Sequence, residues 1–162
     1  MKMNKKGATI IEIIIYTFLS LTLLLTLTEI FSGLLDKSKE SVSFSEVETD
    51  ARFINQKILN DFSRAVTVTS PPNLNSPSES LSFNDGVHTY SYFQSGANLN
   101  LVEDGIIDRL NSFGTEVSGF TVSRFGNPGG KSLLKISFNL KSTIIQPKGF
   151  EEKTVNLSIG TR

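Results

Sequence analysis

The sequence predicts an α+β fold in which a long amino-terminal helix, half membrane-spanning and half amphipathic, packs on an antiparallel β-sheet. Residues 8–35 form an apolar run without Lys, Arg or Pro. Apolar residues then recur at helical spacing from Val47 to Ala65, which predicts an amphipathic helix. After residue 132, apolar and polar residues alternate as in a strand with one buried face. The apolar stripe of the helix would cover the dry face of such a sheet.

Residues 8–35 are expected to form a transmembrane helix. At 1.5 Å per residue, these 28 residues are long enough to cross about 30 Å of hydrocarbon. Lys2, Lys5 and Lys6 precede the run, and because basic residues stay on the cytoplasmic side, we expect the amino terminus inside and the rest outside. A secretory signal peptide is the weaker interpretation, because signal cores have about 15 apolar residues and end in a small-residue cleavage site.

Residues 36–66 are expected to continue the helix as an amphipathic segment. Two pairs of opposite charge four residues apart, Glu48 with Arg52 and Lys57 with Asp61, are expected on its exposed side. The apolar side, with steps of three and four residues, consists of Val47, Ala51, Ile54, Ile58, Phe62 and Ala65.

Two features limit this helix. Four serines within residues 36–45 lower helix propensity, so a local break is expected there. Ser70-Pro71-Pro72 makes further helix improbable, because proline lacks the amide donor and forces the preceding residue out of the helical region. The long helix is therefore expected to span about residues 8–66.

Residues 67–162 are expected to form the antiparallel β-sheet domain. Residues 70–80 are turn formers with little to bury, which predicts a surface loop. Asn84-Asp85-Gly86 between extended runs is a tight-hairpin signal, and Gln94-Ser95-Gly96 marks the next turn. The expected strands cover residues 81–83, 88–93, 99–103, 134–141 and 155–159.

Composition excludes several classes of function. The 162 residues include 16 basic and 16 acidic side chains, and without the three lysines of the first seven residues 13 face 16, a net charge of minus three. No basic excess is left that would indicate nucleic-acid binding. The lack of cysteine excludes disulfides and thiolate metal sites.

No catalytic, metal or cofactor site is predicted, so we expect a protein that is not an enzyme. The single histidine, His88, has no cysteine or second histidine to act with, and we expect a surface or cross-strand role for it. Gly126-Asn127-Pro128-Gly129-Gly130 is followed by Lys131-Ser132, but the next residues alternate as a strand and do not open the helix of a phosphate loop, so a hairpin loop is expected. Three acids lack EF-hand spacing and are expected to be ordinary turn acids: Glu103, Asp104 and Asp108.

Glu12 is the most informative residue of the chain. An acidic residue at the centre of a membrane helix costs roughly 2.5–3.5 kcal/mol on insertion scales, so such residues are usually paired or functional. Cleavage after Gly7 would create a free amine on Ala8, and that amine in one subunit could meet Glu12 of a neighbour. Glu29, the other acid of the run, is expected to lie where the helix leaves the bilayer.

These residues resemble the type IV pilin-like proteins. The precursors of that family carry a short basic leader that ends in Gly and is cut off after it, and then a hydrophobic helix in which Glu is the fifth residue after the cleavage site. Gly7 and Glu12 match those positions. The resemblance implies a leader at residues 1–7, cleavage between Gly7 and Ala8 by a prepilin peptidase, and N-methylation of Ala8. Ala8 departs from the Phe or Met most common there, and Glu29 replaces a proline frequent in main pilins, which favours a minor subunit.

A second similarity lies in the amphipathic helix. Asp50-Ala51-Arg52-Phe53 and Asn60-Asp61-Phe62-Ser63-Arg64-Ala65 are similar to the helix end of W-type minor pilins and J-type pseudopilins. The resemblance implies a minor pilin or pseudopilin, assembled into a type IV pilus or a type II secretion or competence filament. Its implied partners are other pilin subunits, prepilin peptidase, the inner membrane and the pilus assembly machinery.

One alternative from another class stays open. The chain could be a signal-anchored single-pass membrane protein whose extracytoplasmic β domain binds a target without polymerising. Both interpretations place the helix in the cytoplasmic membrane and the carboxyl-terminal domain outside it. They differ in whether the leader is removed and the subunits assemble.

Overall fold

The computed structural model describes residues 9–126 and 131–160. The chain divides into two compact units, Met1–Ser38 and Lys39–Arg162. Helix α1 (Ile10–Phe62) forms the described part of the first unit and the first element of the second. In the second unit the helix packs against antiparallel β-sheets, which confirms the predicted α+β fold.

Helix α1 differs from the expected helix in two respects. It is α-helical throughout residues 36–45, so the expected break is absent. Serine costs only a few tenths of a kcal/mol in a helix, and Ser43 is fully buried on the packed side, so tertiary packing outweighs propensity here. The helix also ends at Phe62 rather than residue 66, and Ser63 and Arg64 form a turn.

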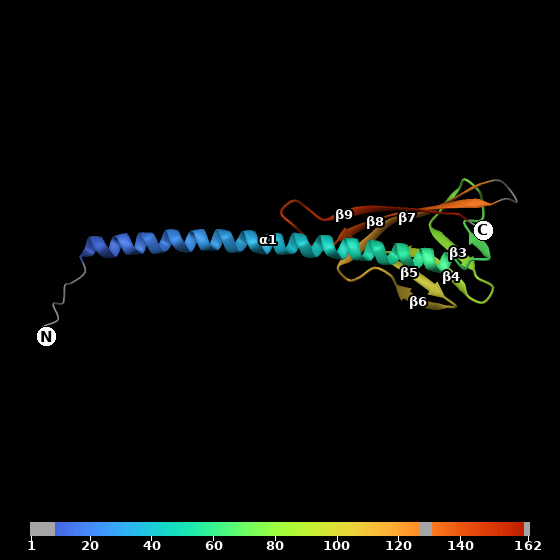
Figure 1. Cartoon of the computed structure of the whole chain (residues 1–162), viewed down its shortest axis with the longest axis horizontal. Coiled ribbons are helices and arrows are strands. Elements are labelled where there is room, and N and C mark those ends of the chain that lie inside the picture. Colours follow the sequence, from blue (N-terminus) through green and yellow to red (C-terminus); the bar gives the residue numbers. More distant parts are fainter. Residues whose placement is uncertain (1–8, 127–130, 161–162) are drawn as a thin grey trace. The chain divides into compact units, whose positions relative to one another are not determined.

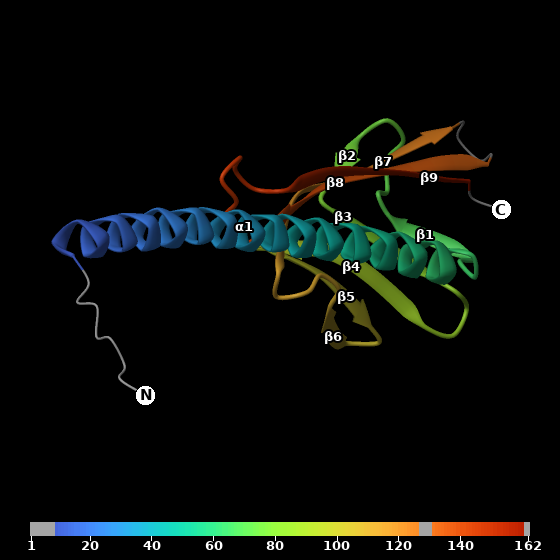
Figure 2. The same cartoon turned by 60° about the vertical axis from the view of Figure 1, so that its left-hand side comes forward.

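The second unit contains two antiparallel sheets where one was expected. The five-stranded sheet has the order β1-β3-β4-β5-β6, and the four-stranded sheet has the order β2-β7-β8-β9. Figures 1 and 2 show the α1 segment of this unit lying along the strands, with β7, β8 and β9 on one side and β5 and β6 on the other. The five-stranded sheet consists of β1 (Thr67–Ser70), β3 (Ser80–Asn84), β4 (Thr89–Ser95), β5 (Asn98–Glu103) and β6 (Ile106–Arg109). The four-stranded sheet consists of β2 (Pro77–Ser78), β7 (Thr115–Gly126), β8 (Ser132–Ser142) and β9 (Glu152–Gly160).

The predicted strands and hairpins are present, with small shifts at their ends. β3 and β4 form a hairpin at Asp85-Gly86, where Gly86 has φ 96°. β7 and β8 are paired up to Gly126 and Ser132, which lie opposite each other, as expected for a hairpin. The residues between them, 127–130, lie outside the described residues. The expected loop 70–80 contains the two-residue strand β2, which pairs with β7.

Strands β1, β2, β6 and β7 were not predicted. In β7 the pairing register shifts between Ser118 and Thr121, so the buried residues Val117 and Phe120 are three apart rather than two. A β-bulge of this kind inserts a residue and hides the alternation that identifies a strand. Gly119, within the bulge, has φ 64°, a conformation that favours glycine.

The core of the second unit joins the helix to both sheets. All five residues from Val47 to Phe62 of the predicted apolar stripe are at most 5% exposed, and Ala65 packs against them. The predicted face of β8 is also buried, with Leu134, Ile136, Phe138 and Leu140 at most 1% exposed. The helix therefore serves as the shared cover of the two sheets.

Candidate functional site

Glu12 lies in the first turn of α1 with its side chain exposed. The hydroxyl of Tyr16, one turn later, donates a long hydrogen bond to Glu12 Oε1 at 3.5 Å. Among residues 9–126 and 131–160, this hydroxyl is the one hydrogen-bond partner of the Glu12 carboxylate, and no cation pairs with it. Gly7 and Ala8, the predicted processing site, lie outside the described residues.

The surface of the first unit is apolar all round. Every large apolar side chain from Ile10 to Leu35 is more than half exposed. A helix that is apolar on all sides is expected inside a membrane or a bundle of helices. Length and composition are sufficient for α1 to cross a membrane once, in agreement with the predicted span.

Four threonine hydroxyls of this surface are satisfied within the helix. The hydroxyls of Thr17, Thr22, Thr26 and Thr28 each donate to a backbone carbonyl three or four residues earlier, at 2.8–2.9 Å. Such bonds let a hydroxyl lie in an apolar medium without an unmet donor. Glu12 and Glu29 are the two carboxylates between Ile10 and Leu35, about 26 Å apart by helical rise.

Asp61 lies in the second unit and is a buried carboxylate, not an exposed one as predicted. It is 4% exposed, and Tyr92 Oη donates to its Oδ2 at 2.6 Å. The expected pair with Lys57 is present at 3.0 Å. Burial raises the pKa of the Tyr92 hydroxyl, and the hydrogen bond to Asp61 raises it further, so Tyr92 remains a donor.

Asp50 is a second buried carboxylate of the helix, and its burial was not predicted. It is 7% exposed, and its Oδ2 accepts hydrogen bonds from Ser112 N and Ser112 Oγ at 2.8 Å and from Thr115 Oγ1. These bonds join the helix to the segment that leads into β7. Asp50 and Asp61 therefore attach the helix to different parts of the β structure, which explains two acids on a packed helix.

The predicted Glu48–Arg52 pair is present, and a third residue joins it. Arg52 Nε lies 3.0 Å from Glu48 Oε1, and Lys153 of β9 contacts Glu48 Oε2. The hydrogen bonds from Lys153 and then Arg52 lower the pKa of Glu48. Glu48 thus connects the helix to β9, the edge strand of the four-stranded sheet.

His88 joins two hairpin turns of the five-stranded sheet, the cross-strand role expected for it. Its Nδ1 lies 2.5 Å from Asp104 Oδ2, while its backbone N donates to Asp85 Oδ1. The hydrogen bond to Asp104 raises the pKa of His88, and the same bond lowers the pKa of Asp104. Across the described part of the chain, no three His, Asp or Glu side chains are grouped to hold a metal ion.

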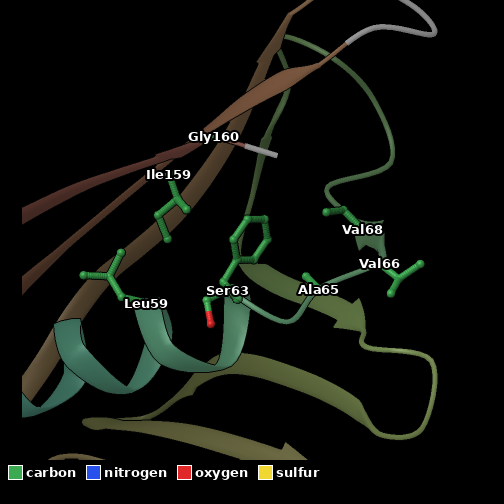
Figure 3. Close-up of a pocket in the computed structure, with 8 residues that line it drawn as sticks. Leu59, Ser63, Ala65, Val66, Val68, Ile159 and Gly160 are labelled. Carbon is green, nitrogen blue, oxygen red and sulfur yellow. The ribbon is translucent and has the colours of Figure 1, made fainter. Parts of the chain in front are cut away.

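An apolar hollow lies where the carboxyl end of α1 meets the ends of β1 and β9 (Figure 3). Its volume is about 180 Å³. Leu59 and Ile159 lie on one side, and Ala65, Val66 and Val68 on the other. No catalytic side chain was predicted in this region, and the lining offers only the Ser63 hydroxyl as a polar side chain.

Comparisons with protein-family models, with curated proteins and with solved structures found no match to this chain.

Proposed function

We propose that this protein is a minor pilin or pseudopilin: a structural subunit that enters a filament through its amino-terminal helix after a prepilin peptidase cuts between Gly7 and Ala8. In this proposal the unprocessed chain waits in the inner membrane with its β domain outside. Other pilin-type subunits and the assembly machinery are its partners.

The observation that carries the proposal is the state of Glu12. Its carboxylate projects from a helix whose surroundings are apolar from Ile10 to Leu35, and its described neighbour is a neutral hydroxyl 3.5 Å away. A carboxylate in such a medium needs a positive partner. The amine that cleavage would create on Ala8 of an adjoining subunit supplies that charge.

The proposed pairing also gives a register to the assembly. Helices with uniformly apolar surfaces can slide past one another at little cost, because every position offers similar contacts. A buried charge pair breaks this degeneracy, because any other register leaves the carboxylate unpaired. Removing one member of a buried pair costs about 3–5 kcal/mol, which corresponds to at least about a hundredfold loss in equilibrium association.

Substitution of Glu12 tests the mechanism. Glu12→Val should insert into the membrane as well as the wild type but be recovered in sheared filaments at less than a tenth of the wild-type amount. Glu29→Val, which removes the other acid of the same apolar surface, is the matched control and should assemble. Normal assembly of Glu12→Val with wild-type partners would refute the pairing.

Mass spectrometry of the amino terminus tests the family assignment separately. A methylated chain beginning at Ala8 in sheared fibres supports a pilin-type subunit. An intact leader on a stable membrane monomer would instead identify the alternative, a signal-anchored binding protein that does not polymerise.

A further inference from the structure

The apolar hollow has the size of one side chain. An engineered cavity of about 150 Å³ holds a benzene molecule, so the 180 Å³ of the hollow can take one branched or aromatic side chain. Val66, on its rim, is 72% exposed, and Leu59 is 42% exposed. These side chains stay in contact with water unless another group fills the space between them.

An apolar side chain of matching size lies at the opposite end of the same sheet. The hollow adjoins Gly160, the last residue of β9, whereas the β8–β9 loop (residues 143–151) precedes its first residue. Nine residues at about 3.3 Å each separate the two ends by roughly 30 Å. Ile145, in this loop, is 70% exposed.

The β8–β9 loop holds Ile145 in place. Thr143 N donates to Gly114 O at 2.9 Å on one side of Ile145. On the other side, Gln146 and Gly149 exchange two backbone hydrogen bonds of 3.0 Å. An apolar side chain on an anchored loop loses little conformational entropy on docking.

Phe113, near the same end, is a poorer candidate for the hollow. It is 89% exposed, but the Arg109 guanidinium carbon lies 4.6 Å from the centre of its ring. Insertion of this ring into an apolar hollow would require removal of the cation or its desolvation. Ile145 has no such charged neighbour stacked on it among the described contacts.

Charge along the four-stranded sheet favours contact between its opposite ends. The end next to the hollow carries Lys131 and Lys135, both exposed, and Arg124 opposite Leu134. No acidic residue occurs between positions 117 and 150. The end next to the β8–β9 loop carries three acids, Glu116, Glu151 and Glu152.

Three lysines also lie at the loop end, but Lys148 and Lys153 are paired with Glu40 and Glu48, so the three acids outnumber the one lysine that is left, Lys141. Lys141 lies over the ring of Phe150 at 3.9 Å from its centre, and Lys148 lies 3.9 Å from Glu40. The basic end of the sheet in one copy therefore attracts the acidic end of the sheet in another copy, whereas two ends of the same charge repel.

We propose that Ile145 of one copy of this chain inserts into the apolar hollow of a second copy, in a head-to-tail contact between β domains. The two patches differ, so the contact is heterologous and repeats along a row of copies rather than closing as a pair. The inference rests on the proposed function for the parallel alignment of the copies. It adds a second, extracytoplasmic contact to the Glu12 pairing.

The lack of cysteine in the chain allows a direct test by disulfide cross-linking. Val66→Cys places a thiol on the rim of the hollow, and Ile145→Cys places one at the docking side chain. The full-length double variant, oxidised in filaments or membranes, should form a ladder of dimers, trimers and larger products on a non-reducing gel. Neither single variant can exceed a dimer, because each chain then holds one thiol.

The matched control combines Val66→Cys with Ile106→Cys, since Ile106 on β6 is 68% exposed, nearly the same as Ile145. We expect at least tenfold less cross-linked product from this control. In chains without cysteine, Ile145→Asp should lower the yield of assembled chain at least tenfold, whereas Ile106→Asp should leave it unchanged.

The outcomes separate this inference from the proposed function. Absence of a ladder in filaments that contain chain processed at Ala8 would overturn the contact and leave the proposed function standing. A cross-link to a different protein would show that another subunit fills the hollow and would overturn the assignment to a second copy. A ladder from membranes in which the leader is intact would support the contact and count against the proposed processing.

Discussion

Removal of the Tyr92 hydroxyl should measure how strongly the helix is held by its buried acid. Tyr92 Oη lies 2.6 Å from Asp61 Oδ2, and Tyr92 is fully buried. A hydrogen bond to a charged group contributes about 1.5–3 kcal/mol, and loss of the hydroxyl leaves Asp61 paired with Lys57 at 3.0 Å. Tyr92→Phe should therefore lower the free energy of unfolding by about 1.5–3 kcal/mol, without the larger cost of an unpaired buried charge.

The same contact can be tested by a double-mutant cycle. Asp61→Asn keeps an acceptor of similar shape, but a bond to a neutral acceptor is roughly half as strong. Tyr92→Phe should cost about 1 kcal/mol less in the Asp61→Asn background than in the wild type. Tyr90→Phe is the matched control, since Tyr90 is 3% exposed and its hydroxyl lies 3.4 Å from Asp85.

Pulse proteolysis of the full chain in detergent across a urea gradient suits these variants, because its signal does not depend on tyrosine. The wild type and variants should share one slope with urea and differ in midpoint. If Tyr92→Phe costs no more than Tyr90→Phe, or if the two substitutions at positions 61 and 92 add without coupling, the hydrogen bond does not hold the helix.

Two further predictions concern the second unit. Ile58→Ala, at a fully buried position of the apolar stripe, should lower the free energy of unfolding by about 2–5 kcal/mol in the same assay, whereas Leu59→Ala, 42% exposed, should cost about 1 kcal/mol or less; equal costs would contradict the packing described. The pKa of His88 is raised in the folded chain from 6.5, so its ion pair with Asp104 stabilises the fold below that value and the gain is lost as the pH rises through the raised pKa. His88→Gln should remove this loss from a comparison of unfolding midpoints at pH 5 and pH 9, and an unchanged pH dependence would show that the pair contributes nothing.

Prediction from the sequence worked where one periodicity continued without interruption. The stripe from Val47 to Phe62 and the alternation in β8 identified buried faces correctly, because each face must be apolar to be covered. Prediction failed at β7, where the bulge between Ser118 and Thr121 interrupts the alternation. It also missed β6, although Asp104-Gly105 before it carries the same Asp-Gly signal as the recognised hairpin, and both residues have positive φ.

The buried acids show a different limit. Asp61 was placed on the solvent side because Lys57 four residues earlier is a typical surface partner. The hydroxyl that justifies its burial comes from Tyr92, 31 residues later, and the partners of Asp50 come from positions 62 and 65 residues later. A single sequence contains no local pattern that announces such distant partners.

The sequence alone thus determined the α+β class, the apolar helix long enough for a membrane and the stripe that packs on strands, because these depend on local order of apolar and polar residues. It also supplied Gly7, Ala8 and Glu12, on which the proposed function depends. Only the tertiary structure decided the division of nine strands into two sheets among the described residues, the burial of Asp50 and Asp61, and the placement of the hollow and Ile145 at opposite ends of β9. The physical reason is that these features arise from contacts between residues far apart in the chain, whose partners are chosen by packing of the whole domain.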